Sequence, residues 1–413
     1  MNVLLVTTCW WPAFARLAQL LMETGCGVAV LCPPGHPARM LPGVTVFEQR
    51  PFSPLRALSR AILRFDPVFI IPGDERASHH MHRLHGHGST RERELIEHSI
   101  GAPESYSDTV SRIGLLARAR RLLISIPAGQ AITGEGELAA WIAAMPAPSV
   151  LKLDGSWGGM GVIIVATRQA AFTAYRRLRR QTSAGRAVFR MIVNRDAYWL
   201  ADCLRGRPTE VSVQSFIQGL PSDLSMFCWK GEVLAAVMGE AVISLGATRP
   251  TSIIRLINRP DMMDTARRLA GEMRLTGFYG LDFIIEAVTD RAYLLEMNPR
   301  PTSLTNIRMQ PGRDLPGALA TALSGTPCPP PTRLPEGTLV AYFPLAWQDG
   351  HPDATHPQAH LDVPWNEPAL MAEMLQQRWP ERQLLARLEQ ACRRAARSIA
   401  RLPARFNRAL RRS

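Results

Sequence analysis

Short apolar runs alternate with helical patterns through residues 1–95. Mostly apolar segments occupy residues 2–6 and 27–33, and later ones occupy 44–48 and 66–74. Between them, apolar residues recur at helical spacing, as they do at 54–64 and at Ala15, Leu17, Leu20 and Leu21. This alternation predicts a parallel α/β sheet. Because no GxGxxG follows the first strand, a dinucleotide site there is not expected.

The middle of the chain mixes helices with pairs of strands. Residues 105–145 have a mostly helical pattern, with a strand at 126–133. A strand and glycine-rich loop follow at 149–165. We then expect a helix at 168–180 and an alternating strand at 209–219.

Strands dominate the next region. Residues 226–242 read as strands split by the turn "WKGE", and 261–274 as an amphipathic helix. The segments 278–286 and 292–298 then predict a β-hairpin. The proline-dense stretch 326–337 marks a domain edge.

The hairpin places three oxygen-bearing side chains together. With its turn centred near Thr289, Asp282 lies opposite Glu296, and Asn298 shares the face of Glu296. Carboxylate and amide oxygens suit Mg²⁺, and Arg300 could reach an anion beside the metal. The alternative is two acids facing solvent on an exposed hairpin.

Composition draws attention to Lys152. The chain has 46 arginines and only two lysines, Lys152 and Lys230. Lys152 ends an apolar strand and precedes four glycines within nine residues, in "KLDGSWGGMG". Glycines let backbone amides approach phosphate, and lysine supplies a compact charge, although a glycine-rich turn can also be only a turn. No GK[ST] closes the loop, so it is not a Walker loop.

Together these segments resemble the ATP-grasp superfamily. The resemblance rests on "SR" at 111–112, "VLKLDGSWGGMGVIIV", "VSVQSFIQG" and "GFYGLDFIIE…AYLLEMNPRP", and it spans residues 105–310. It looks closest to the carbamoyl-phosphate-synthetase-like, carboxylate–amine ligase branch. It implies a mixed α/β and α+β fold with three parts: a Rossmann-like pre-ATP-grasp domain, a two-lobed ATP-grasp domain and a small basic helical extension, at 1–104, 105–325 and 326–413.

The resemblance also implies roles for individual residues. Lys152 and Arg112 match phosphate contacts, and a flexible loop closing over the phosphates is matched by Gly158, Gly159 and Gly161. The hinge strand beside adenine is matched by Gln214, Ser215, Phe216 and Ile217, with Gln214 standing where many members have glutamate. Asp223 is assigned to the ribose hydroxyls. Arg300 matches the arginine that stabilises the transferring phosphate, and the ligands of two Mg²⁺ ions (or Mn²⁺) are matched by Asp282, Glu296 and Asn298.

The implied reaction is phosphoryl transfer from ATP to a substrate carboxylate. An amine then displaces phosphate from the acylphosphate, and ADP is the nucleotide product. A thiol acceptor and bicarbonate activation are alternatives, the latter without a biotin-carrier-like Met-Lys pair in the chain. A non-catalytic ATP-binding or membrane-adaptor protein is the alternative from another class. ATP-grasp relatives are often dimers, so a homodimer is a further expectation.

The positive charge is concentrated at the C-terminus. Residues 378–413 carry eleven arginines and two acids, which is +9 of the net +13. Apolar residues at helical spacing among these arginines predict a basic amphipathic helix that begins at Pro380. Peripheral membrane contact through 380–413, docking on a partner, and packing on its own domain all fit this helix. Nucleic acid is not an expected partner, because no recognition motif or aromatic platform accompanies it.

Several further sequence features fit more than one interpretation. The histidine-rich segment 79–88 is either a polar helix face or a zinc site. Trp10 and Trp11 belong either to a core or to a substrate pocket near Gly73-Asp74. Arg249 and Arg255 suit either the surface or an acidic substrate. Scattered cysteines without a CxxC pair, and no window apolar enough to span a membrane, favour the cytoplasm.

Overall fold

The structure of the protein is a computed structural model. It describes residues 1–145, 148–153, 161–180, 184–194, 197–204, 211–244, 251–329, 334–348 and 359–388. The chain divides into two compact units, residues 1–180 with 208–375 and residues 181–207 with 376–413. Among the described helices, none is both long and apolar enough to cross a membrane.

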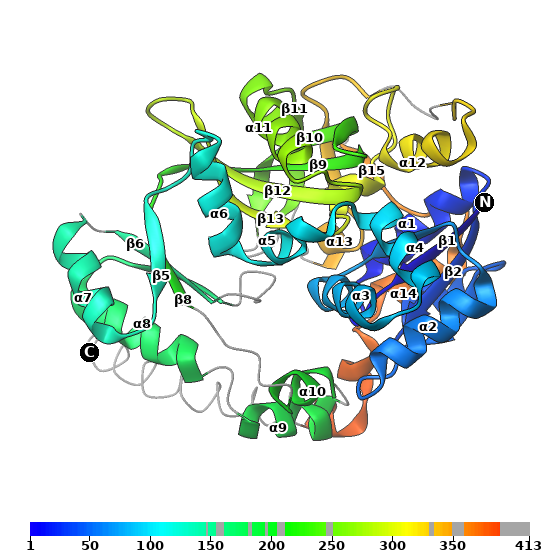
Figure 1. The fold of residues 1–413 in the computed structure, drawn as a ribbon, viewed down its shortest axis with the longest axis horizontal. Coiled ribbons are helices and arrows are strands. Elements are labelled where there is room, and N and C mark those ends of the chain that lie inside the picture. Colours follow the sequence, from blue (N-terminus) through cyan, green and yellow to red (C-terminus); the bar gives the residue numbers. More distant parts are fainter. Residues whose placement is uncertain are drawn as a thin grey trace, which may run out of the picture. The chain divides into compact units, whose positions relative to one another are not determined.

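The first sheet confirms the predicted parallel α/β arrangement (Figure 1). Its strand order is β3-β2-β1-β4, and all three pairings are parallel. The strands are β1 (Asn2–Val6), β2 (Gly27–Cys32), β3 (Thr45–Glu48) and β4 (Phe69–Pro72). The helices among them are α1 (Pro12–Glu23), η1 (Pro37–Met40), α2 (Pro54–Phe65), α3 (Glu75–His87) and α4 (Thr90–Ile100).

Alternate residues of this sheet enter two different cores. Leu5 and Ile71 pack in the cluster that includes α1, whereas Leu4 and Ile70 pack in the cluster that includes α2, α3 and α4. Such two-sided burial is why its strands read as continuous apolar runs. The fold at this end is therefore Rossmann-like.

A small antiparallel sheet follows, with the order β5-β8-β6-β7. Its strands are β5 (Gly129–Ile132), β6 (Ser149–Leu153), β7 (Val162–Val165) and β8 (Val211–Ser215). The helices of this region are η2 (Pro103–Ser105), α5 (Tyr106–Val110), α6 (Arg112–Arg121), α7 (Glu135–Ala144) and α8 (Arg168–Arg180). Leu151 and Val213 point to the face covered by α7 and α8, so Lys152 and Gln214, one residue further along each strand, point to the other face.

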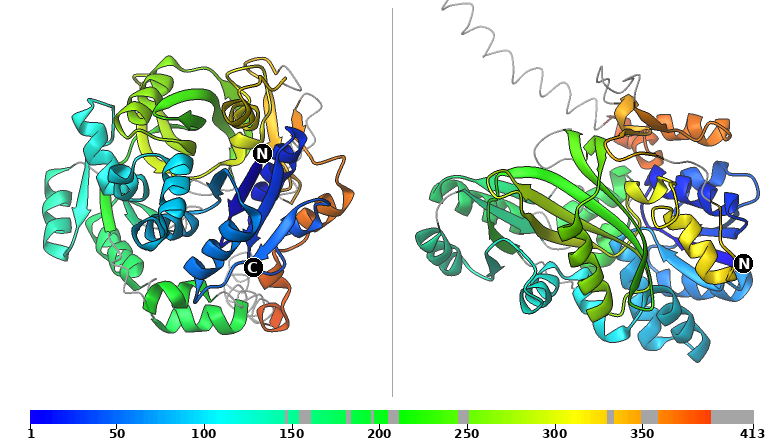
Figure 2. Two further views of the ribbon diagram at one scale, coloured as in Figure 1. Left: turned by 45° about the vertical axis from the view of Figure 1, so that its right-hand side comes forward. Right: turned by 90° about the horizontal axis from the view of Figure 1, so that it is seen from above.

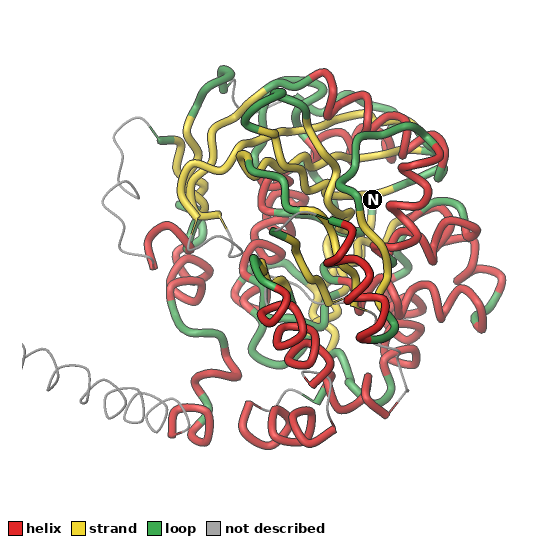
Figure 3. Tube along the Cα trace, turned by 90° about the vertical axis from the view of Figure 1, so that its left-hand side faces the viewer, coloured by secondary structure: helices red, strands yellow, loops and turns green. Residues whose placement is uncertain are grey.

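The large sheet has seven strands in the order β13-β12-β9-β10-β11-β14-β15. Figure 2 shows β9 and β10 as the long twisted green strands, and Figure 3 shows the sheets in yellow among the red helices. The strands are β9 (Gly219–Trp229), β10 (Glu232–Ser244), β11 (Thr251–Ile257), β12 (Gly277–Glu286), β13 (Ala292–Asn298), β14 (Leu339–Tyr342) and β15 (His360–Asp362). The helices are α11 (Pro260–Glu272), η3 (Ser303–Asn306), α12 (Leu315–Ser324), α13 (Leu345–Gln348) and α14 (Pro368–Leu375).

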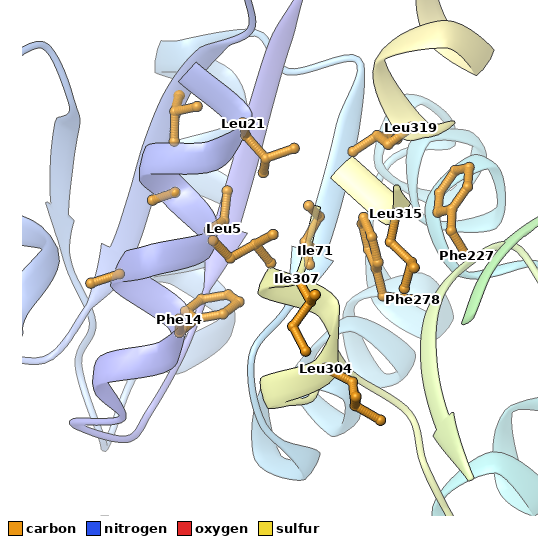
Figure 4. Packing of buried hydrophobic residues seen from close by; sticks show 14 of the residues in the cluster. Leu5, Phe14, Leu21, Ile71, Phe227, Phe278, Leu304, Ile307, Leu315 and Leu319 are labelled. Atoms are coloured by element: carbon orange, nitrogen blue, oxygen red, sulfur yellow. The ribbon is translucent and has the colours of Figure 1, made fainter. Parts of the chain in front are cut away.

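One core joins the parallel sheet to the large sheet (Figure 4). From the parallel sheet and α1 it takes Leu5, Phe14, Leu21 and Ile71; from the large sheet, η3 and α12 it takes Phe227, Phe278, Leu304, Ile307, Leu315 and Leu319. Because β14 and β15 complete the large sheet, residues beyond the proline-dense stretch belong to the same sheet as the hairpin. The division into 1–104, 105–325 and 326–413 stays a prediction.

The second unit contains α9 (Ala184–Asn194), α10 (Tyr198–Leu204) and η5 (Trp379–Arg382). The predicted start of the C-terminal helix at Pro380 is wrong. Pro380 lies in the 3₁₀ turn η5, and α-helix begins only at Leu384. Gln383 between them has extended backbone. The later apolar positions of the predicted helix, from Ala391 onward, lie outside the described residues.

Candidate functional site

The hairpin has the register that the sequence predicts. Asp282 pairs directly with Glu296, and Gly280 pairs with Asn298. On its other side Asp282 pairs with Asp223 of β9. Three carboxylates therefore lie in one row across neighbouring strands of the large sheet. Asp223 was expected at the ribose, and its place in this row is a finding of the structure.

Charge repulsion within this row changes proton affinities. Desolvation and then the charges of Asp223 and Glu296 raise the pKa of Asp282 well above its usual range. Desolvation, followed by Glu296, raises the pKa of Asp223 to about 6. For Glu296, desolvation favours a raised pKa, but Arg112 and Lys152 outweigh it and the pKa is lowered. The row thus holds more negative charge than its surroundings stabilise, except at Glu296.

Three cations come to the row from different parts of the chain. Arg112, the first residue of α6, donates from Nε to Glu296 Oε2 at 3.1 Å. Arg300 donates from Nη2 to Asn298 Oδ1 at 3.1 Å, and Asn298 Nδ2 donates to Asp282 Oδ1 at 2.9 Å. Burial and then the charge of Arg112 lower the pKa of Lys152 to about 8, although Glu296 and Asp282 act in the opposite direction. The structure therefore brings together the side chains predicted to bind metal and phosphate.

The small sheet presents a polar face beside Lys152. Lys152 pairs with Ser212, and Gln214 lies two residues further along the same face of β8. Both Gln214 Nε2 and Ser212 Oγ are buried without a hydrogen-bond partner within the described residues. Buried donors of this kind are costly unless something pairs with them, so this face is suited to a polar ligand.

The predicted hinge connects the two sheets. Gln214 and Ser215 end β8, and Phe216 and Ile217 lie in the segment that leads into β9. Gly161 is a buried turn residue whose carbonyl accepts from the Leu153 amide at 2.8 Å. Gly158 and Gly159, the other two glycines of the predicted phosphate loop, lie outside the described residues, as does Arg249.

One partner of Arg300 was missed by sequence reasoning. Arg300 Nε donates to Glu75 Oε1 at 3.0 Å, and its guanidinium lies 5.1 Å from the centre of the Trp11 ring. Ser78 Oγ also donates to the Pro299 carbonyl at 2.9 Å. The start of α3 and the loop after β1 therefore contact the site. Their position in the sequence could have indicated this contact, because each segment follows the carboxyl end of a parallel strand, where such sheets bind ligands.

The residues before Glu75 have a structural role. Asp74 accepts from Thr7 Oγ1, from the Thr8 amide and hydroxyl, and from the Ala77 amide in the first turn of α3. A side chain on Gly73 would meet the Phe14 ring at 2.7 Å, so glycine allows α1 to approach β4 closely. Trp10 is buried and donates to the Pro34 carbonyl at 2.7 Å.

Two histidines of α3 pack against Tyr106. His82 stacks on Tyr106 with ring centres 4.4 Å apart, and burial lowers its pKa to about 4. His85 lies edge-on to the same ring and contacts Glu97. Arg255 pairs with Glu240 at the surface of the large sheet. His82, His85 and Arg255 therefore each have partners within the described part of the protein.

The carboxylate row has the right chemistry for a hard cation. The row offers carboxylate oxygens, and Asn298 beside it offers an amide oxygen. Desolvation and then mutual repulsion raise the pKa of Asp223 and Asp282, and a bound cation would relieve the repulsion. In the described part of the chain, no three His, Cys, Asp or Glu side chains already converge on one point. Glu296 is turned to Arg112, so a cation would compete with that ion pair.

Comparison with known proteins agrees with this geometry. A family model described as an ATP-grasp domain matches residues 199–304, which include Asp223, the hairpin and Arg300. Residues 199–304 of this chain therefore correspond to an ATP-grasp domain. No curated protein sequence matches it.

Several solved enzyme structures share the fold. The ADP complex of N5-carboxyaminoimidazole ribonucleotide synthetase matches with a TM-score of 0.57 and 15% identity, over 82% of this chain and 80% of that one. An L-amino acid ligase from Bacillus licheniformis gives 0.54 and 12%, over 78% and 74%. The biotin carboxylase domain of a Hydrogenobacter thermophilus 2-oxoglutarate carboxylase, solved with MgADP and bicarbonate, gives 0.56 and 14%, over 81% and 70%. At these identities the likeness establishes the fold alone.

Proposed function

We propose that this protein is an ADP-forming ligase that activates a substrate carboxylate with ATP and passes the acyl group to an amine. The observation that carries the proposal is the Asp223–Asp282–Glu296 row, bordered by Arg112, Lys152 and Arg300. Acids and bases clustered in such numbers, with Arg112 and Lys152 buried and the acids half-buried, are costly to fold, and their placement suits a ligand that brings both phosphate and a metal ion.

The residues divide into binding and positioning roles. Lys152 and Arg112 would bind phosphate oxygens, and Gln214 to Ile217 would line the adenine. Mg²⁺ would be held by Asp282, Glu296 and Asn298, and when bound it supplies charge neutralisation for the polyphosphate. Asp223 would either contact the ribose, as the resemblance implies, or add charge to the metal side of the row.

The proposed reaction has two successive displacement steps, and each forms one bond and breaks another. An oxygen of the substrate carboxylate attacks the γ-phosphorus, and the bond to the ADP oxygen breaks. The amine nitrogen then attacks the acyl carbon, and inorganic phosphate leaves. Arg300 is placed to stabilise charge on the transferring group, because Glu75, Trp11 and Asn298 hold its guanidinium among the carboxylates.

Oxygen-18 transfer tests this sequence directly. If the acid is labelled in its carboxylate, one labelled oxygen must appear in the inorganic phosphate. Unlabelled phosphate, or AMP in place of ADP, would contradict the proposal. The measurement also separates acylphosphate formation from simple ATP hydrolysis.

Bicarbonate is a second candidate for the activated acid. The Hydrogenobacter thermophilus carboxylase domain, which shares the fold, was solved with bicarbonate and MgADP. Bicarbonate-dependent ADP formation without any other acid would favour this variant. Either reaction requires ATP and Mg²⁺. The cysteines are scattered without a CxxC pair, which is typical of proteins from a reducing compartment, so we place the protein in the cytoplasm.

A further inference from the structure

The second unit carries nearly all of the net charge of the protein. Residues 181–207 and 376–413 contain sixteen arginines and four acids, a formal charge of +12 out of +13 for the chain. The larger unit, with the nucleotide site, is therefore close to neutral. Two segments far apart in sequence thus concentrate the basicity in one compact unit.

The same unit exposes large apolar side chains. It contains 32 of the 348 described residues but seven of the twenty large apolar side chains exposed in them. On α9, Val188, Phe189 and Ile192 are exposed by 39%, 44% and 55%, and their spacing puts them on one helix face. Leu204 at the end of α10 and Leu384 are each 72% exposed. A soluble surface seldom gathers such residues without a partner.

We propose that this unit binds an anionic lipid surface through both segments. A helix that shows apolar residues on one face within a strongly basic unit inserts those residues at the headgroup level, while arginines pair with lipid phosphates and carboxylates. A nucleic acid would use the arginines but would gain little from exposed side chains that, apart from Phe189, are aliphatic. The apolar exposure therefore favours lipid. This inference goes beyond the proposed ligase activity and does not depend on it.

Vesicle co-sedimentation of the full chain tests the proposal. Wild type should bind vesicles of phosphatidylcholine with phosphatidylserine and should not bind vesicles of phosphatidylcholine alone. The triple variant Val188→Ser/Phe189→Ser/Ile192→Ser keeps the charge and should lose at least tenfold in binding. A matched triple, Leu63→Ser/Leu123→Ser/Val288→Ser, changes exposed apolar residues of the larger unit and should bind like wild type. Removal of residues 380–413 from wild type should also weaken vesicle binding.

Two results would overturn the proposal. One is wild type that does not sediment with the anionic vesicles. The other is an α9 triple variant that still binds vesicles like wild type. Binding would then depend on charge alone, as binding to RNA or DNA would. Circular dichroism checks that the variant folds, and Leu384→Ser/Leu388→Ser tests the other segment of the same unit if it does not.

Discussion

At the scale of single residues, Lys152 is one of two lysines in a chain with 46 arginines. Its pKa of about 8 means that the side chain begins to lose its proton in mildly alkaline solution. Because phosphate would bind the charged form, affinity for ATP should be highest below pH 8 and should fall as the pH rises through that value. In Lys152→Arg this dependence should vanish, since arginine stays charged. Titration calorimetry between pH 7 and 9.5 measures the affinity for ATP. If the affinity falls equally with pH in wild type and in Lys152→Arg, Lys152 does not contact phosphate.

Glu75 gives a residue-scale prediction outside the hairpin. Glu75→Gln removes the ion pair that holds Arg300 but keeps the shape of the side chain. We expect kcat to fall by about tenfold, with the KM for ATP little changed, because misplacing a group that acts on the transferring phosphate is costly. Glu75→Asp should recover part of the loss. A change confined to KM would instead place Glu75 in substrate binding.

At the scale of elements, the β12–β13 hairpin sets the carboxylate row. Asp282→Asn replaces a carboxyl whose pKa is raised by desolvation and by its neighbours, so it removes repulsion from the ligand-free protein. We expect its melting temperature without ligand to equal or exceed that of wild type. The stabilisation by ATP with Mg²⁺ should shrink by most of its value. A loss of ligand-free stability would mean that Asp282 is structural.

The core between the parallel and large sheets gives a stability prediction. Phe227 is fully buried, and its ring lies 5.0 Å from that of Phe278 and 6.5 Å from that of Phe69. Phe227→Ala should lower the free energy of unfolding by about 3–5 kcal/mol, the usual cost of such a cavity. Denaturant unfolding followed by fluorescence measures this. The exposed Phe52→Ala serves as the control and should change little.

The sequence predicts some of these elements and contacts and not others. The Asp282–Glu296 pairing was predictable, because a short turn fixes the register of a hairpin and alternation fixes its faces. Helix α8 was predicted over residues 168–180, as observed. The contact of Glu75 with Arg300 was not, since residues 225 positions apart meet only through packing of two sheets. The separation of Pro380 from the helix at Leu384 was also missed, because proline is as compatible with a 3₁₀ turn as with a helix start.

At the scale of the whole molecule, the larger unit combines a Rossmann-like sheet with the two sheets of the ATP-grasp domain. Each contributes to the site: the parallel sheet through Glu75 and Trp11, the small sheet through Lys152, and the large sheet through the carboxylates. The nucleotide chemistry is thus proposed for a nearly neutral unit, and lipid binding for a basic one. Because the two roles use different residues, variants of one should leave the other intact.

The most direct test of the central claim is ATP turnover with Mg²⁺ against a panel of carboxylic acids, amino acids and bicarbonate, with ADP and AMP measured separately. Wild type should form ADP and phosphate only when its acid is present, and both Glu296→Gln and Lys152→Ala should lose this activity. AMP as the product, or acid-dependent ADP formation that survives in Glu296→Gln, would contradict the ligase proposed for this site.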